Sequence, residues 1–156
     1  MKIKRAELSD INDIDRLLEQ VCKVHADIRP DLFIAGKRKY TEEELAAIIK
    51  DDSKPIFAAF DETGRFAGYC FTVIEDHAGF NEPPHKTLYI DDLCVDESMR
   101  GKHVGKALYD HVCDWAKKNG FYNITLHVWE GNDKAKAFYE AMGMKIQLYG
   151  METVLD

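Results

Sequence analysis

A short basic turn, Arg100-Gly-Lys-His-Val-Gly-Lys106, combines residue types that bind phosphate. It follows an apolar, β-branched run, Tyr89–Val95, and leads directly into a helical pattern that begins near Val104. At the start of a helix the backbone N–H groups have no intrahelical acceptor, and the helix dipole adds positive potential there. A strand, a basic glycine-containing turn and a helix in succession therefore predict a site for a phosphate group.

Two common phosphate-binding motifs do not match this turn. A Walker loop requires G-x-x-x-x-G-K followed by Ser or Thr, but here Gly101 and Gly105 are too close together and Ala107 follows Lys106. The dinucleotide fingerprint G-x-G-x-x-G, which opens a βαβ unit, is also absent. The turn therefore belongs to another class of phosphate site.

Two segments resemble the GNAT superfamily of acyl-CoA-dependent N-acetyltransferases. The segment Arg100–Gly105 is similar to the family signature Q/R-x-x-G-x-G/A at its arginine and its last glycine, with His103 where the family usually has its first glycine. The segment Asn132–Met144 resembles the family pattern N-x-x-A-x-x-F-Y-x-x-x-G-F. The two segments occur in the family's order, and the resemblance covers nearly the whole chain.

This resemblance implies that the chain binds acetyl-CoA and releases CoA. The N–H groups of Gly101 to Lys106 would hold the pyrophosphate, and the strand Leu93–Val95 would pair with the pantetheine arm in the manner of an added strand. Asn132 would reach the arm or the phosphates, and it could also cap the last helix. The implied cofactor-binding residues are Leu93, Cys94, Val95, Arg100, Gly101, Lys102, His103, Val104, Gly105, Lys106 and Asn132.

Acetyl transfer needs a neutral amine, a donor for the developing oxyanion and a proton for the leaving thiolate. The resemblance assigns the proton donor to Tyr139, and a backbone N–H near Cys94 would serve the oxyanion. Asp91 and Asp92 are jointly predicted to act as the base, with Glu75 as another candidate. Adjacent residues of a regular strand point to opposite faces, and a strand irregularity here would change that alternation.

These residues also have structural interpretations. Tyr139 could be a core residue of its helix, and the acidic pair could cap a loop or bind a lysine. However, the run Tyr89–Val95 looks like the acidic strand of spermidine/spermine N-acetyltransferases, in which such residues bind or deprotonate a polyamine. The prediction is therefore a small-molecule amine acceptor, such as a polyamine. Two alternatives stay open: a protein or peptide amine as acceptor, and an acetyl-CoA sensor without catalysis.

The hydrophobic periodicity predicts one mixed α/β (α+β) domain over residues 1–156, in the order β-α-α-β-β-β-α-β-α-β-β, with helices on both faces of a partly parallel sheet. Ser9 is the expected cap of the first helix, and Thr41–Glu44 form a capping box for the second. The expected strands span 2–7, 55–60, 65–75, 87–95, 122–129, 144–149 and 151–155, the expected helices 10–25, 42–51, 104–119 and 133–142, and the segment 76–86 is expected to be a loop.

Composition excludes several classes of protein. The 156 residues carry a net charge of −7, which argues against a nucleic-acid partner. Residues 41–97 hold fourteen acidic and four basic side chains, whereas residues 98–120 hold two acidic and five basic ones, so a cationic acceptor and an anionic cofactor could bind at different places. There is no apolar segment after the first charged residues and no long apolar run, which predicts a cytoplasmic protein without a membrane partner.

The cysteines and histidines do not predict a metal site. The four cysteines are widely spaced and lie in apolar patterns, which favours buried free thiols. The six histidines are scattered along the chain, with His25 and His85 at loop edges that could border the acceptor. Relatives in the superfamily are commonly homodimers, so a homodimer is a further expectation, although no residue pattern marks an interface.

Overall fold

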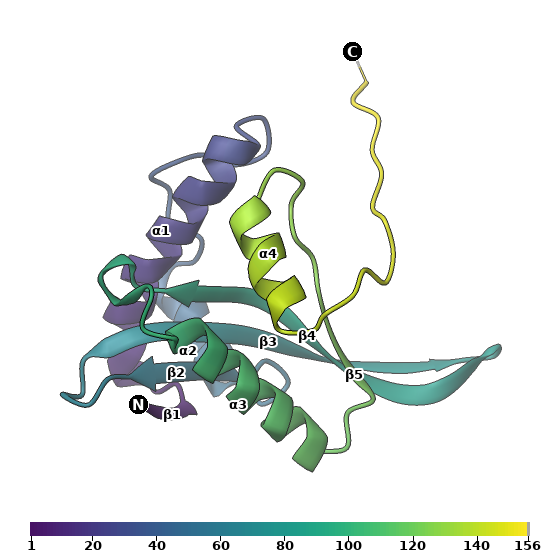
Figure 1. Cartoon of the computed structure of the whole chain (residues 1–156), viewed down its shortest axis with the longest axis horizontal. Helices are drawn as coiled ribbons and strands as arrows, with labels where there is room; N and C mark the ends of the chain where they lie inside the picture. Colours follow the sequence, from purple (N-terminus) through teal and green to yellow (C-terminus); the bar gives the residue numbers. More distant parts are fainter. Residues whose placement is uncertain (156) are drawn as a thin grey trace.

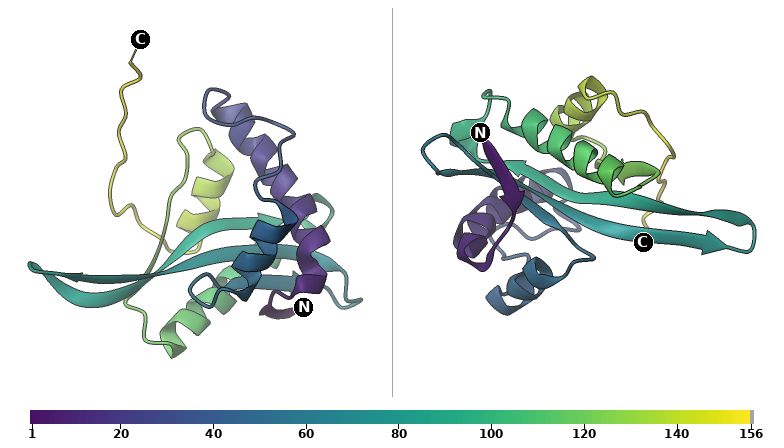
Figure 2. Two further views of the ribbon diagram at one scale, coloured as in Figure 1. Left: turned by 180° about the vertical axis from the view of Figure 1, so that it is seen from behind. Right: turned by 90° about the horizontal axis from the view of Figure 1, so that it is seen from below.

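A sheet runs through the middle of the molecule, and helices cover both of its faces (Figures 1 and 2). The computed structural model describes residues 1–155. Its strands are β1 (Lys2–Arg5), β2 (Ile56–Phe60), β3 (Phe66–Gly79), β4 (Glu82–Val95) and β5 (Asn123–Leu126). Its helices are α1 (Ile11–Ile28), α2 (Glu42–Lys50), α3 (Val104–Lys118) and α4 (Asp133–Ala141), with short 3-10 turns at Leu8–Asp10 and Glu97–Met99.

The strands lie side by side in the order in which the chain forms them. The pairs β1–β2, β2–β3 and β3–β4 are antiparallel, and β4–β5 is parallel because α3 carries the chain back to the end where β4 began. None of the helices described has the length and apolar character that crossing a bilayer requires. The predicted mixed α/β fold, with a parallel section after the hairpins, is confirmed.

Each face of the sheet has its own apolar core, because successive strand residues point to opposite sides. On one face α1 and α2 pack on the sheet through Ile14, Leu17, Leu18, Leu45 and Ile49. On the other face α3 packs through Val104, Leu108 and Val112, with Phe138 and Tyr139 of α4 and the following Met142 partly buried beside them. The view from below in Figure 2 shows this division, with α1 and α2 on one side of the sheet and α3 and α4 on the other.

The helix starts agree with the sequence in one case and differ in another. The predicted capping box of α2 is formed, since Thr41 Oγ1 accepts from Glu44 N at 3.1 Å and Glu44 Oε2 accepts from Thr41 N at 2.8 Å. The prediction that Ser9 caps α1 is wrong. Ser9 lies inside the 3-10 turn, and Glu7 and Asp10 form the capping box of that turn. The first helix also continues to Ile28, beyond the predicted end near His25.

The predicted loop 76–86 is wrong, because β3 and β4 continue through it as one long hairpin. The strands stay paired as far as Gly79 and Glu82, and the turn lies between these two residues (Figure 1). Pro83 and Pro84 suggested a loop because proline has no N–H to donate to a ladder. The two prolines occupy the register shift between the two last pairs, where β4 has an extra residue and the ladder is already interrupted.

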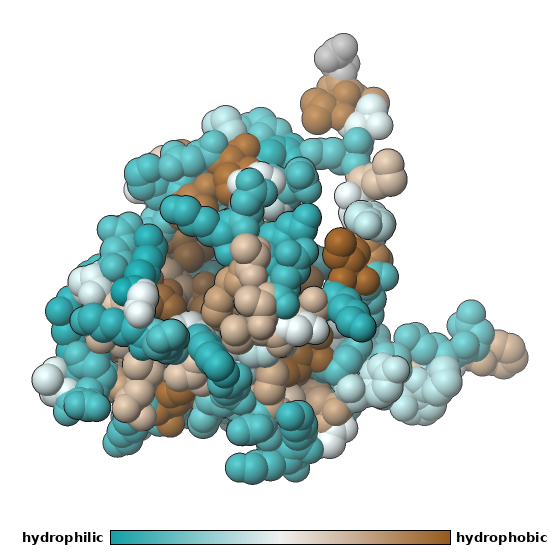
Figure 3. Space-filling model, in the orientation of Figure 1, coloured by the Kyte–Doolittle hydropathy of each residue, from teal (hydrophilic) through white to brown (hydrophobic). Residues whose placement is uncertain are grey.

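The two predicted C-terminal strands, 144–149 and 151–155, are also wrong. This segment forms no strand and runs away from the body of the molecule (Figures 1 and 3). Its apolar side chains are exposed: Ile146, Leu148, Tyr149, Met151, Val154 and Leu155. The apolar pattern suits a strand, but a strand also needs a partner edge, and none is paired with this segment within the described chain. The predicted strand 122–129 is shorter in the structure, where β5 ends at Leu126 rather than Trp129.

Candidate active site

The β4 strand is irregular at the acidic pair. Phe71 of β3 pairs with Asp92. The next residue, Thr72, pairs with Ile90, which leaves Asp91 as an extra residue in β4. A bulge of this kind interrupts the regular alternation of side chains and re-aims the residues around it. In consequence Asp91 is exposed, whereas Asp92 is partly buried.

Asp92 has an unusual environment for a carboxyl group. Its Oδ2 accepts a hydrogen bond of 2.7 Å from Tyr69 Oη, and Tyr69 is fully buried. Burial raises the pKa of Asp92 to about 6, against the opposing effects of the Tyr69 hydrogen bond and the positive charge of Lys39. A carboxyl group with a pKa close to physiological pH can accept a proton from a substrate, and such shifts are concentrated at functional sites.

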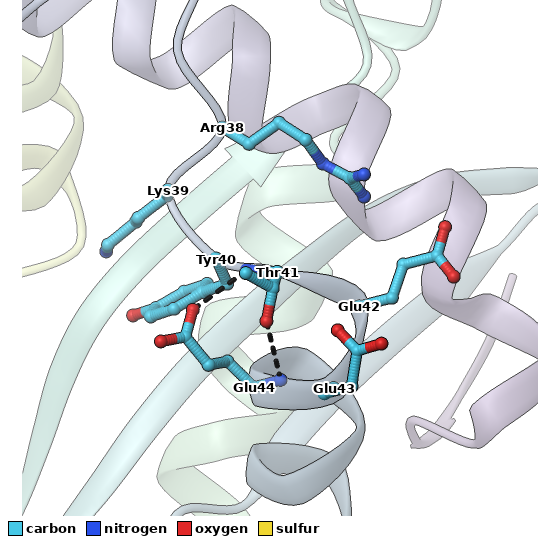
Figure 4. A pocket seen from close by; sticks show the side chains of 7 residues that line it. All are labelled: Arg38, Lys39, Tyr40, Thr41, Glu42, Glu43 and Glu44. Atoms are coloured by element: carbon cyan, nitrogen blue, oxygen red, sulfur yellow. Dashed lines mark hydrogen bonds between the residues drawn. The ribbon is translucent and has the colours of Figure 1, made fainter.

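A lysine from the loop before α2 lies against this acidic pair. Lys39 Nζ is 3.2 Å from Asp91 Oδ2 and 5.3 Å from the centre of the Tyr40 ring. Burial disfavours the charged form of Lys39, but the carboxylates of Asp91 and Asp92 outweigh it and raise its pKa. Lys39 and Tyr40 line a pocket at the start of α2, in which Arg38 extends in the opposite direction from Lys39 (Figure 4). The acidic pair is therefore matched by one positive charge.

The basic turn after β4 presents unpaired backbone donors. Within residues 1–155 the N–H groups from Gly101 to Lys106 have no hydrogen-bond acceptor, and the N–H of Ala107, bonded to His103 O at 3.0 Å, is the first after them that has one. Gly101 (φ 77°) and His103 (φ 60°) both have left-handed backbone, which turns the chain sharply before α3. Consecutive N–H groups in such a turn form a concave site for an anion.

Asp96 fixes the beginning of this turn. Its carboxylate accepts hydrogen bonds from Ser98 N at 2.9 Å and from Arg16 of α1 at 2.6 Å. Burial opposes the charged form, but these bonds outweigh it and lower the pKa of Asp96 to about 2. The ionised carboxylate therefore connects α1 to the turn. Of the basic side chains in the turn, Lys106 pairs with Asp110 at 2.5 Å and Arg100 lies 3.9 Å from Glu97.

The edge of β4 beside the turn has no strand partner. Pairing with β5 runs from Thr87 to Ile90 and stops there, because β5 ends at Leu126. Over the described chain, Asp92–Val95 are thus paired on one side only, with β3. Unpaired N–H and C=O groups on a strand edge can bind an extended molecule that carries amides.

Tyr139 faces the same region from α4. It is partly buried beside Phe138, and its ring centroid lies 6.4 Å from that of Tyr109. Burial, together with the negative charges that Cys70 and Asp92 can carry, raises the pKa of Tyr139 well above that of a free phenol. The phenol is therefore protonated at neutral pH and can donate a hydrogen bond. Asn132 caps α4 by accepting from Ala135 N at 3.3 Å.

The chain matches the model of the acetyltransferase (GNAT) family over residues 19–144. The chain belongs to the GNAT family of acetyltransferases. The predicted family is confirmed, and the matched residues include both the turn after β4 and α4. Members of the family use acetyl-CoA as co-substrate.

Curated relatives of this GNAT chain include two proteins named glucosamine 6-phosphate N-acetyltransferase. The protein from Trypanosoma brucei brucei is 31% identical over 83 residues, which cover 53% of this chain and 53% of that protein. The protein from Arabidopsis thaliana is 27% identical over 119 residues, covering 76% of this chain and 70% of that protein. The chain thus spans about half the length of the first relative. Among solved structures, a mutant of protein BH1408 from Bacillus halodurans has a TM-score of 0.94 and 29% identity, covering 99% of both chains.

Several residues predicted for this GNAT site are brought together. Asp91 and Asp92 lie at the bulge, next to the open edge of β4, and Tyr139 of α4 lies near enough for the charge of Asp92 to raise the pKa of its phenol. Glu75 is not part of this group, because it lies farther along β3 and its Oε2 is 3.6 Å from His77 Nε2. His85 lies in the extended hairpin, where it pairs with His77, and is not part of the group at the bulge either.

Sequence reasoning missed three residues of the GNAT site. They are Tyr69, which binds Asp92, Lys39, which binds Asp91, and Asp96, which fixes the turn. Tyr69 lies in an apolar run and Lys39 in an irregular loop, so neither carries a local signal. Asp96 does carry one, since Asp96-Glu-Ser98 is a short polar sequence of the kind that caps a turn.

Proposed function

We propose that this GNAT chain is an N-acetyltransferase that transfers the acetyl group of acetyl-CoA to a primary amine of a small molecule, by direct attack in a ternary complex. The observation that carries the proposal is Asp92, a carboxyl group with a pKa of about 6 beside the unpaired edge of β4. A sensor that only bound the cofactor would not need a carboxyl group with such a pKa, and this favours an enzyme over the sensor.

The residues present fit acetyl-CoA. The unpaired N–H groups of Gly101–Lys106 suit the pyrophosphate, with Arg100 and Lys102 as neighbouring positive charges. The free edge at Leu93–Val95 suits the amides of the pantetheine arm. Asn132 is already used as the cap of α4, so its side-chain oxygen has a structural role beside any contact with the cofactor.

Acetyl-CoA supplies an activated acetyl group as a thioester. Asp92 would take the proton of the attacking amine, directly or through a water molecule, because its pKa is near that of a useful base. Asp91, exposed and next to Lys39, would orient the acceptor rather than take its proton. A backbone N–H near Cys94 would stabilise the oxyanion, and the protonated phenol of Tyr139 would donate to the departing sulfur.

Two classes of acceptor follow from the charges around the bulge. A small cationic amine such as a polyamine is favoured by Asp91 and Asp92 and by the acidic segment 41–97. An amine that also carries an anionic group is favoured by Lys39, whose ammonium lies at the same place, and by the names of the two curated relatives. A protein or peptide amine is the remaining alternative. None of the side chains described in the site favours it.

A thiol-release assay tests the proposal. Purified protein and acetyl-CoA are incubated with a panel that includes spermidine, glucosamine 6-phosphate and a lysine peptide, and free CoA is measured. Release with one amine class identifies the acceptor. Lys39→Ala separates the two small-molecule classes, because it should slow a phosphorylated amine and leave or speed a polyamine. Tight acetyl-CoA binding without release for any amine would instead support the sensor.

Three further expectations stay proposals: a single N-acetyltransferase domain over residues 1–156, a cytoplasmic location, and a homodimer without nucleic-acid or membrane partners. Support for the homodimer comes from the exposed apolar side chains of residues 144–155, which a second copy could cover. Light scattering on the intact chain measures the oligomeric state directly.

A further inference from the structure

The long β3–β4 hairpin brings together side chains that the sequence places in a loop. His77 of β3 and His85 of β4 are cross-strand partners, so they project from the same face of the ribbon. Their rings are stacked with centroids 4.6 Å apart and planes inclined by 17°. Glu82, on the same strand as His85, completes a group whose potential ligand atoms all lie within 4.8 Å of one another.

One hydrogen bond determines which nitrogen of His85 is available. His85 Nδ1 lies 2.9 Å from the carbonyl oxygen of Pro83. A carbonyl oxygen can only accept, so in the neutral imidazole Nδ1 carries the proton and Nε2 keeps its lone pair. That Nε2 lies 3.9 Å from Glu82 Oε1, on the side of the group. A backbone carbonyl bound to the second ring nitrogen is the arrangement that orients most histidine ligands of metals.

The surroundings favour a cation. His77 Nε2 lies 3.6 Å from Glu75 Oε2, so carboxylates stand beside both imidazoles. The side chains of His77, Glu82 and His85 are 34%, 48% and 27% exposed, which leaves the group open to ions from solvent. Tyr122 packs its ring edge-on against His85 at 5.5 Å and limits the motion of that imidazole.

We propose that His77, Glu82 and His85 form a binding site for a divalent transition metal of the Zn²⁺ class. Two imidazole nitrogens and one carboxylate oxygen are ligands that Zn²⁺ accepts, and three protein ligands leave one tetrahedral position open for water or another donor. Small side-chain rotations on the exposed hairpin bring the ligand atoms to distances of about 2.0–2.2 Å from the metal.

This site is separate from the proposed acetyl-transfer site. His85 and Asp92 are seven positions apart in the extended strand, which corresponds to roughly 23 Å along β4. A metal ion here would join β3 to β4 near the turn, where, within residues 1–155, no third strand pairs with the two-stranded ribbon. Its role is therefore to fix the end of the hairpin and to present an open coordination position there.

Calorimetric titration of the full chain, purified without a histidine tag, with Zn²⁺ tests the site. We expect one Zn²⁺ per chain, with the affinity at least about tenfold weaker in His77→Gln, His85→Gln and Glu82→Gln. Asp76→Asn is the matched control, since it removes a carboxylate from the opposite face of the same hairpin and should leave the affinity unchanged. Circular dichroism checks that each variant is folded.

A second readout uses the unmodified protein. Long-range proton–nitrogen NMR spectra of the imidazoles should show that Zn²⁺ shifts Nε2 of His85, with Nδ1 still protonated. The proposal is overturned if the His77→Gln/His85→Gln double variant binds Zn²⁺ as tightly as the unmodified chain. That result would place the ion at the partly exposed thiols of Cys22 or Cys113 instead. Neither outcome depends on whether the chain transfers acetyl groups.

Discussion

The two ends of β4 have the same backbone but different chemistry. The body end, Ile90–Val95, lies between the two apolar cores and carries a partly buried carboxyl group with a raised pKa. The hairpin end, Glu82–Lys86, belongs to a two-stranded ribbon whose polar side chains are exposed or half-exposed. The body end is also followed by a turn with left-handed backbone at Gly101 and His103, whereas the hairpin end contains no such residue.

This difference shows what burial contributes to a site. At the body end, desolvation raises the pKa of Asp92 to about 6, so its carboxylate can accept a proton much more readily than an ordinary carboxylate. At the hairpin end, water screens the charges, and the chemistry depends on which ligand atoms the strand register brings together. Variants at the body end should therefore change acetyl transfer, and those at the hairpin end should change metal binding.

The largest expected effect is that of Asp92→Asn. Loss of the base should lower turnover by roughly 10²–10⁴-fold in the acetyl-transfer assay. The same change should raise the free energy of unfolding at pH 7.5 by about 1–3 kcal/mol, because Asn keeps the acceptor for Tyr69 without a charge to desolvate. The folded-state pKa lies above the unfolded one, so this gain builds up between about pH 4 and 6 and is absent below.

Asp91→Asn is the control for that prediction. It removes the neighbouring, exposed carboxylate and should slow turnover far less than Asp92→Asn, with no gain in the free energy of unfolding. Equal losses of turnover in the two variants would show that burial does not distinguish the two carboxylates, and the comparison between the ends of β4 would fail.

Tyr139→Phe should have the next largest effect, a loss of roughly 10²-fold in turnover at unchanged acetyl-CoA affinity. Removing the hydroxyl takes away the donor to the leaving sulfur but keeps the ring that packs beside Phe138. Stopped-flow kinetics with calorimetry of acetyl-CoA binding measures both quantities. Turnover equal to that of the unmodified protein would leave Tyr139 with a packing role only.

Gly105→Asp should weaken acetyl-CoA binding by roughly tenfold to a hundredfold. A Cβ at this position would lie 3.3 Å from Phe138 and 3.5 Å from Val95, and the new carboxylate would repel a phosphate at the start of α3. Gly150→Asp adds the same charge where no atom lies within 4 Å, so it is the matched control. Calorimetry that finds equal affinities would remove the turn from the cofactor site.

The smallest effect is expected for His103→Gly. His103 is the non-glycine residue with positive φ in the described chain, and that conformation costs about 1 kcal/mol for a residue with a Cβ. Glycine removes this cost but has more freedom in the unfolded state, so the net gain should be below about 1 kcal/mol. Thermal unfolding measures it, and a clear loss of stability would show that the imidazole contributes contacts that offset the strain.

Local patterns predicted the parts of the molecule that depend on local chemistry. The Thr41 capping box, the apolar faces of the helices and the basic turn are each determined by residues a few positions apart. The backbone also explains why the family usually has glycine at the position of His103, because this residue has a left-handed φ.

The parts that could not be predicted depend on partners far away in the sequence. The bulge at Asp91 arises from the register with β3, and the raised pKa of Asp92 depends on burial together with Tyr69 and Lys39. The group of His77, Glu82 and His85 depends on the pairing of β3 with β4, and Pro83 and Pro84 indicated a loop there instead. The apolar segment 144–155 has the sequence pattern of strands, but forms none without a partner edge.

Carbon-13 NMR titration of the Asp92 side-chain carboxyl group, assigned by its loss in Asp92→Asn, tests the central claim most directly. It requires no knowledge of the acceptor. A midpoint near pH 6, well above the ordinary value for an aspartic acid, is the predicted result. A midpoint near pH 4 for Asp92 would contradict the claim that the body end of β4 has made this carboxyl group a base.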